Sequence, residues 1–174
     1  MKKTALLIID VQTGLIEHGM YNGEKLIKNL KLLKEKADKN IIEIIYIVHD
    51  GGLGSILEYG TPPWEIYKEI KPHSNEKIFN KKYNSAFKET GLKEYLDSKG
   101  IERLVIAGLQ TEYCINFSLV VAVEYGYEIV IPKESISTCD GPKFSAKDIN
   151  DFYYNVIWKD RVGKVLDIEE IIWK

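Results

Sequence analysis

Two residues with reactive side chains, Asp10 and Cys114, each lie shortly after an apolar run of the sequence. Asp10 directly follows the apolar run 5–9, and Cys114 follows the apolar run 104–109 after four intervening residues. A thiol at the start of a helix ionises more readily, because the helix dipole and free N–H groups stabilise a thiolate. A thiol and a carboxylate brought together are the groups that nucleophilic catalysis with a general base requires.

Each residue also has a structural interpretation. An aspartate that ends a first strand can be a helix cap or a metal ligand, and a single cysteine is usually a small buried apolar residue. Cys139 lies in a turn rich in Ser and Thr without an obvious base, so we interpret it as structural. Composition alone predicts nothing special for Lys81, because most lysines are solvated.

Short β-branched runs alternate with amphipathic segments, which is typical of a parallel sheet covered by helices. Strands are predicted over 5–9, 41–49, 76–81, 103–109, 128–131 and 162–168, and helices over 23–39, 92–99, 114–125 and 145–157 with a short terminal helix. The predicted fold is α/β: a single domain over 1–174 with a three-layer α/β/α doubly wound sheet of about six parallel strands, order 3-2-1-4-5-6. In this order, ligands bind at the switch point between the first and fourth strands, where Asp10 and Cys114 would meet.

The composition excludes several classes of protein. The 174 residues carry a net charge of −2 with scattered lysines, which argues against a nucleic-acid surface. No apolar stretch is long and uncharged enough to cross a membrane. Two cysteines without metal-ligand spacing indicate free thiols in a reducing compartment, and we expect a cytoplasmic protein.

Three stretches of the sequence carry recognisable motifs in the expected order. They are Ile8-Ile9-Asp10-Val11-Gln12, the run from Lys81 through Ser85-Ala86-Phe87 to Thr90-Gly91-Leu92, and Val105-Ile106-Ala107-Gly108-Leu109-Gln110-Thr111-Glu112-Tyr113-Cys114-Ile115. Together they resemble the isochorismatase-like cysteine hydrolases, which include nicotinamidases, N-carbamoylsarcosine amidases and ureide hydrolases. The resemblance extends from about residue 4 to about residue 140.

The resemblance implies a mechanism and assigns roles. Asp10 would be the base, Lys81 the supporting cation and Cys114 the nucleophile, in the hydrolysis of a C–N bond of a small molecule through a thioester. Backbone N–H groups of Gln110 and Cys114 would form the oxyanion hole, with a cis peptide at Leu109–Gln110. The resemblance also implies a homo-oligomer without a cofactor.

Further residues are candidates for supporting roles. Gln12, Trp64 and Tyr113 are candidates for the substrate pocket, and ordinary packing is the alternative for each. Trp64 lies in a long irregular segment over 50–75, where it could also pin the loop or contact a second subunit, as could Tyr153 and Trp158.

The chain departs from nicotinamidases after the second predicted strand. Their Asp-x-His metal pattern is absent from His49-Asp50-Gly51-Gly52, so we predict no metal and disfavour nicotinamidase activity. We interpret His49 as a strand-end residue, and whether His49 or Asp50 contributes to the site is left open.

Other functions remain as alternatives. The second enzymatic hypothesis is an isochorismatase-type vinyl-ether hydrolase, although such enzymes need no cysteine. A nucleotide- or flavin-binding module would carry a glycine-rich turn after the first strand, whereas this turn reads Val11-Gln12-Thr13-Gly14. A catalytically silent family member is the third alternative. The identity of the substrate cannot be read from the sequence.

Overall fold

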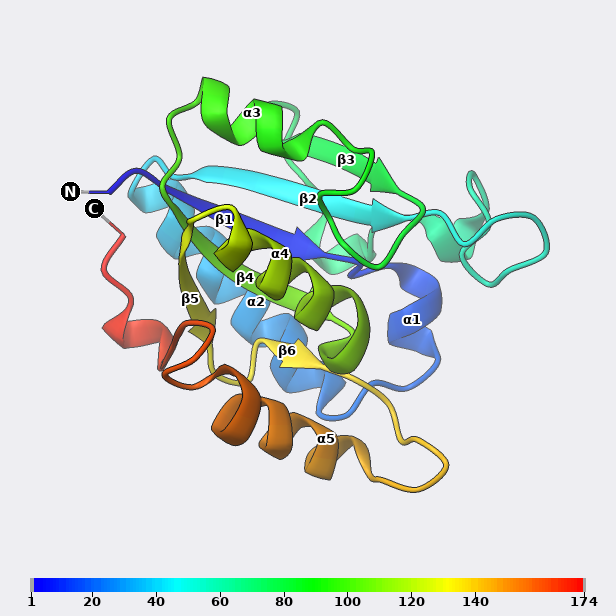
Figure 1. The fold of residues 1–174 in the computed structure, drawn as a ribbon. Coiled ribbons are helices and arrows are strands. Elements are labelled where there is room, and N and C mark those ends of the chain that lie inside the picture. The colour runs from blue at the N-terminus through cyan, green and yellow to red at the C-terminus, as the bar shows by residue number, and fades with distance from the viewer. Residues whose placement is uncertain (1, 174) are drawn as a thin grey trace.

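A parallel sheet forms the centre of the protein in the computed structural model, which describes residues 2–173 (Figure 1). Its strands are β1 (Thr4–Ile9), β2 (Glu43–His49), β3 (Lys77–Lys81), β4 (Arg103–Leu109), β5 (Glu128–Pro132), β6 (Ile136–Ser137) and β7 (Lys164–Leu166). The order is β3-β2-β1-β4-β5-β7, which confirms the predicted doubly wound arrangement. The short strand β6 pairs with β4 off this path and was not predicted, because two residues show no periodicity.

Helices cover both faces of the sheet. They are α1 (Thr13–Glu17), α2 (Gly23–Lys39), α3 (Leu92–Ser98), α4 (Asn116–Glu124) and α5 (Ala146–Phe152). Figure 1 shows α4 in front of the sheet and α2 behind it. Successive residues of β1 alternate between the two cores, so that Leu7 packs with residues of α3 and α4 while Leu6 and Ile8 pack with residues of α2.

The end of α2 corrects the predicted start of the second strand. We expected this strand from residue 41, but β2 begins at Glu43 because the chain first makes a Schellman turn. The Ile42 N–H donates to the Ala37 carbonyl and the Ile41 N–H to the Asp38 carbonyl. Ile41 has φ +56° and is 88% exposed, although isoleucine rarely adopts this conformation.

Two other predicted helices differ in their bounds. The helix expected over 114–125 is α4, preceded by a widened helical turn over Thr111–Ile115. The helix expected over 145–157 is α5, followed by a second widened turn over Tyr153–Trp158. Trp158, which we considered for a subunit interface, is fully buried in the core and donates its indole N–H to Asn116 Oδ1.

The segment over 50–75 contains no strand and only two short 3₁₀ turns, at Pro62–Trp64 and Lys68–Ile70. Backbone hydrogen bonds join it to the segment after β1: Thr13 N–H donates to the Glu65 carbonyl, and Tyr67 N–H donates to the Val11 carbonyl. The long loop is therefore held against the carboxyl end of the sheet. Within residues 2–173, no helix has the length and apolarity needed to cross a membrane.

Candidate active site

The carboxyl ends of three adjacent strands bring polar side chains together. Asp10 directly follows β1, while His49 is the last residue of β2 and Lys81 the last residue of β3. His49 and Lys81 lie opposite each other in the parallel register of β2 and β3. Because the side chains at these positions lie at the same level of the sheet, they can share one site.

The Lys81 ammonium is the centre of this cluster. Its Nζ lies 2.7 Å from Asp10 Oδ2, 3.0 Å from His49 Nδ1 and 3.1 Å from Cys114 Sγ. It also donates to the Tyr83 carbonyl at 3.1 Å. Lys81 is 2% exposed, so its charge is stabilised by these partners rather than by bulk water.

Asp10 has the backbone conformation of a sharp turn. Its φ is +52°, a left-handed value that aspartate tolerates better than most residues, and its N–H donates to the Ile47 carbonyl. The carboxylate is almost fully buried, and its Oδ1 has no hydrogen-bond partner among the described residues. This oxygen is therefore free to accept a proton from a neighbouring group.

Cys114 reaches the cluster from the widened turn between β4 and α4 rather than from the first turn of a regular helix. The Tyr113 backbone, with φ −107° and ψ −106°, is non-helical and interrupts the turn just before the cysteine. Burial and the Asp10 charge raise the pKa of the Cys114 thiol to about 12, and the Lys81 charge opposes this only in part. Burial and Asp10 thus act against the thiolate that a helix start was expected to favour, and they favour the neutral thiol.

The end of β4 approaches β1 closely. A Cβ on Gly108, whose φ is +125°, would lie 2.1 Å from the Ile9 carbonyl oxygen, so only glycine fits at this position. The peptide bond between Leu109 and Gln110 is cis. The Gln110 side chain donates to Cys139 Sγ at 3.3 Å, which places Cys139 in a packing role beside the β4 end.

Gln12 connects two segments of the backbone. Its side chain is fully buried and donates to the carbonyls of His49 at 3.0 Å and of Trp64 at 2.8 Å, while its Oε1 accepts from the His49 N–H at 3.0 Å. Gln12 thus joins the end of β2 to the long loop. The Trp64 ring packs against Tyr59 of the same loop at a centroid distance of 4.6 Å.

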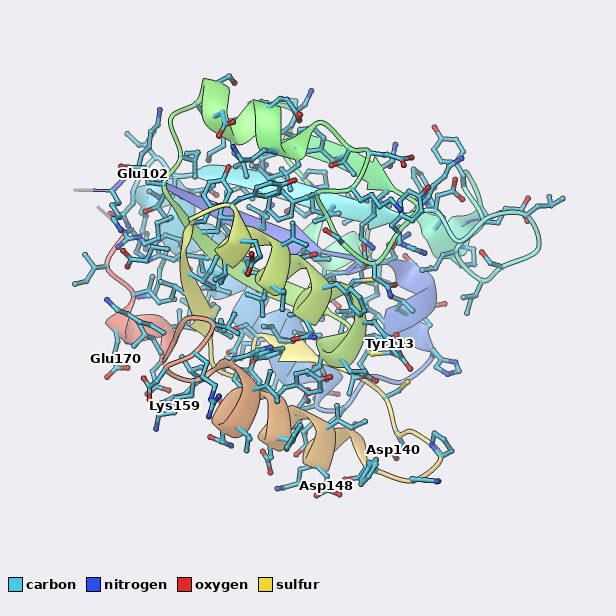
Figure 2. All side chains as sticks on the ribbon, in the orientation of Figure 1. Glu102, Tyr113, Asp140, Asp148, Lys159 and Glu170 are labelled. Carbon is cyan, nitrogen blue, oxygen red and sulfur yellow. The ribbon has the colours of Figure 1, made fainter. Side chains whose placement is uncertain are left out.

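Tyr113, half-exposed, is the pocket candidate that lines a cleft. The cleft has a volume of about 790 Å³ and extends between the turn before α4 and the α5 region. Figure 2 shows Tyr113 in that turn and Asp148 on α5. The remaining lining residues are Glu112, Gly141, Pro142, Lys143, Phe144, Ile149, Phe152 and Tyr153.

A trio of potential metal ligands lies within this site. Donor atoms of Asp10, His49 and Cys114 lie within 4.8 Å of one another. The Lys81 ammonium contacts all three of these donors, so the position of a metal cation is already taken by a positive charge. The trio is better described as the set of partners of Lys81 than as a metal site.

The sequence left the contribution of His49 open, because its place in the site depends on the β2–β3 register. It gave no role to Asn84, whose Oδ1 lies 3.9 Å from Cys114 Sγ. The motif that suggested Lys81 also contains Asn84, and this was the one available signal. Asp50 is directed elsewhere, because its carboxylate accepts from the Gly52 N–H.

The fold and site together define a hydrolase class in which a doubly wound sheet carries an acid, a lysine and a thiol at its switch point. Residues 4–170 match the family model described as Isochorismatase domain. The chain therefore belongs to the isochorismatase family of hydrolases, in agreement with the resemblance of its motifs.

Three relatives illustrate the range of the family. The chain is 28% identical over 149 residues to a streptothricin hydrolase of Streptomyces noursei, covering 84% of this chain and 53% of the relative. It is 29% identical over 100 residues to a maleamate amidohydrolase of Pseudomonas putida, covering 56% of this chain and 47% of the relative. A crystal structure of an isochorismatase family protein superposes with a TM-score of 0.88 at 25% identity, covering 96% of this chain and 99% of that protein's chain. This chain thus spans about half the length of these two curated relatives.

Proposed function

We propose that the protein hydrolyses a C–N bond of a small amide, ureide or carbamoyl compound, with Cys114 as nucleophile, Asp10 as base and Lys81 as supporting cation. The observation that carries this proposal is the contact of one buried ammonium with both the Asp10 carboxylate and the Cys114 sulfur. The relation to a maleamate amidohydrolase supports amide chemistry.

The neutral thiol makes proton transfer part of the attack. With its pKa raised to about 12, Cys114 releases its proton only when a base is at hand. Asp10 Oδ1, which is buried and has no hydrogen-bond partner within residues 2–173, is that base. As the S–H proton passes to Asp10, the sulfur forms a bond to the carbonyl carbon, and Lys81 stabilises the negative charge that develops on sulfur.

The tetrahedral intermediate then collapses. Its oxyanion accepts hydrogen bonds from the backbone N–H groups of Gln110 and Cys114, and each such donor is typically worth about 3 kcal/mol. Asp10 returns the proton to the leaving nitrogen, the C–N bond breaks, and the acyl group stays on Cys114 as a thioester. A water molecule deprotonated by Asp10 then attacks the thioester, which releases the acid and restores the thiol.

The cleft beside Tyr113 is the proposed binding place for the non-reacting part of the substrate. Its walls include the aromatic rings of Phe144, Phe152 and Tyr153, which favour an apolar or planar substituent. The carboxylates of Glu112 and Asp148 at the same cleft would favour hydrogen-bond donors over anions.

Acid-quenched mass spectrometry of the intact protein tests this function. The protein is mixed with a panel of amides, ureides and carbamoyl compounds, and a substrate should add the mass of its acyl group to Cys114 while the amine is released. The Cys114→Ala variant should retain its fold by circular dichroism but lose the adduct and the turnover. Cys139→Ala is the matched control and should form the adduct.

The alternatives predict different results. Turnover of a vinyl ether without any adduct, and unchanged in Cys114→Ala, would indicate an isochorismatase-type reaction instead. Amide hydrolysis that persists in Cys114→Ala would move the chemistry to another residue.

A further inference from the structure

Lys81 has more hydrogen-bond acceptors around it than N–H groups to give. An ammonium has three donors, whereas Asp10 Oδ2, His49 Nδ1, the Tyr83 carbonyl and Cys114 Sγ all lie within 3.1 Å of Nζ. A thiol sulfur is the weakest of these four acceptors. In the resting state the three N–H groups therefore bind the carboxylate, the imidazole and the carbonyl.

His49 is held as an acceptor by its surroundings. Burial and the Lys81 charge lower the pKa of His49 below its usual value, while Asp10 and Asp50 oppose this shift only in part. The imidazole is therefore neutral at physiological pH, and its Nδ1 lone pair is directed at the Lys81 ammonium. The proton of the neutral ring then lies on Nε2.

The backbone of His49 is held by the Gln12 side chain and by its pairing with β3. The Gln12 side chain binds the His49 N–H and the His49 carbonyl, each at 3.0 Å. The β2–β3 register places His49 directly opposite Lys81. Because Gln12 is fully buried, this clamp holds the imidazole at a constant distance from the ammonium.

We infer that His49 is a positioning residue that acts through Lys81. His49 and the Tyr83 carbonyl hold two N–H groups of Lys81, so that the third can pass from Asp10 Oδ2 to the Cys114 sulfur. This transfer accompanies the movement of the thiol proton to Asp10 Oδ1, while Lys81 stays protonated and His49 stays neutral. The inference rests on the roles of Asp10, Lys81 and Cys114 in the proposed function, although it requires no particular substrate.

Alkylation of Cys114 by iodoacetamide tests the inference without a substrate. The rate constant is measured near pH 8 by peptide mapping, which separates Cys114 from Cys139. In His49→Leu the acceptor is lost at similar volume, and the Lys81 N–H that it held becomes available to the Cys114 sulfur. The alkylation rate should therefore rise about tenfold, as expected for one hydrogen bond to a charged group. His49→Asn keeps an acceptor near the Nδ1 position and should stay within about threefold of wild type. The exposed His73, changed to Asn, is the matched control and should leave the rate unchanged.

Two results would overturn the inference. The first is an alkylation rate in His49→Leu at or below that of the wild type, and the second is a rate in His49→Asn as high as in His49→Leu, which would indicate packing rather than hydrogen bonding. If His49→Leu does not fold, His49→Ala supplies the variant without an acceptor. Since alkylation requires no C–N bond cleavage, failure of the amide panel with a positive result here would refute the proposed reaction alone.

Discussion

Lys81 and Asp10 form an ion pair at 2.7 Å although their strands, β3 and β1, are separated in the sheet by β2. Both side chains are almost completely buried. A buried ion pair stabilises a protein only while both partners are present, because a single remaining charge has neither water nor a counter-ion. The ion pair of the candidate site therefore also links the carboxyl ends of β1 and β3 across β2.

Removal of one partner should destabilise the fold. In Lys81→Met the Asp10 carboxylate is left buried without its cation, and we expect a loss of about 3–5 kcal/mol in the free energy of unfolding by urea titration. The double variant Asp10→Asn with Lys81→Met should recover much of this loss, because no unpaired charge remains. Equal stability of Lys81→Met and wild type would show that the pair contributes nothing to folding.

Alkaline pH should destabilise the wild type more than Cys114→Ala. The pKa of Cys114 is raised from 9.0 to about 12 in the folded protein, so the unfolded chain loses the thiol proton first. The contribution of this thiol to the free energy of unfolding is therefore fully present below about pH 9. It decreases as the pH rises towards 12, by at most about 4 kcal/mol in total.

The difference between the two free energies of unfolding isolates this effect, because tyrosines and lysines titrate in both proteins. Urea titrations at several pH values should show Cys114→Ala gaining on the wild type above about pH 9. A constant difference across this range would mean that the Cys114 pKa is not raised in the folded state.

Gln12→Leu should weaken the attachment of the long loop. The substitution keeps the volume but leaves three backbone groups of His49 and Trp64 without their partner, at a cost of at least about 2 kcal/mol. Faster proteolysis within 50–65 should accompany the loss of stability. Thr13→Val removes an exposed hydrogen bond to Glu65 in the same region and should cost less than about 0.5 kcal/mol. Similar losses in both variants would argue against a special role for Gln12.

Gly108→Ala should be strongly destabilising. The new Cβ would lie 2.1 Å from the Ile9 carbonyl oxygen, and the φ of +125° is unfavourable for alanine. We expect a loss of more than about 3 kcal/mol in thermal or urea unfolding. At Gly23, by contrast, a Cβ meets no atom within 4 Å, so Gly23→Ala should be neutral or slightly stabilising. A stable Gly108→Ala variant would mean that β4 can move away from β1.

Local pattern in the sequence was enough to predict the sheet and two of the site's residues. The buried strands appear as short apolar runs, and the strand order follows from alternating strands and helices, which placed Asp10 and Cys114 at one switch point. Lys81 could not be found in this way, because a lysine after a short, weak strand has no distinguishing periodicity. It was found only because its motif resembles that of a known family.

The tertiary structure decided the properties that depend on residues distant in the chain. His49 contacts Lys81 because of the register between two parallel strands, and sequence periodicity does not specify that register. The Gln12 side chain joins His49 to Trp64 because the long loop lies beside the end of β2. The pKa of Cys114 is raised, opposite to the expected direction, because burial and Asp10 outweigh Lys81. Secondary structure follows from neighbouring residues, whereas burial, charge balance and register arise only when the whole chain has packed.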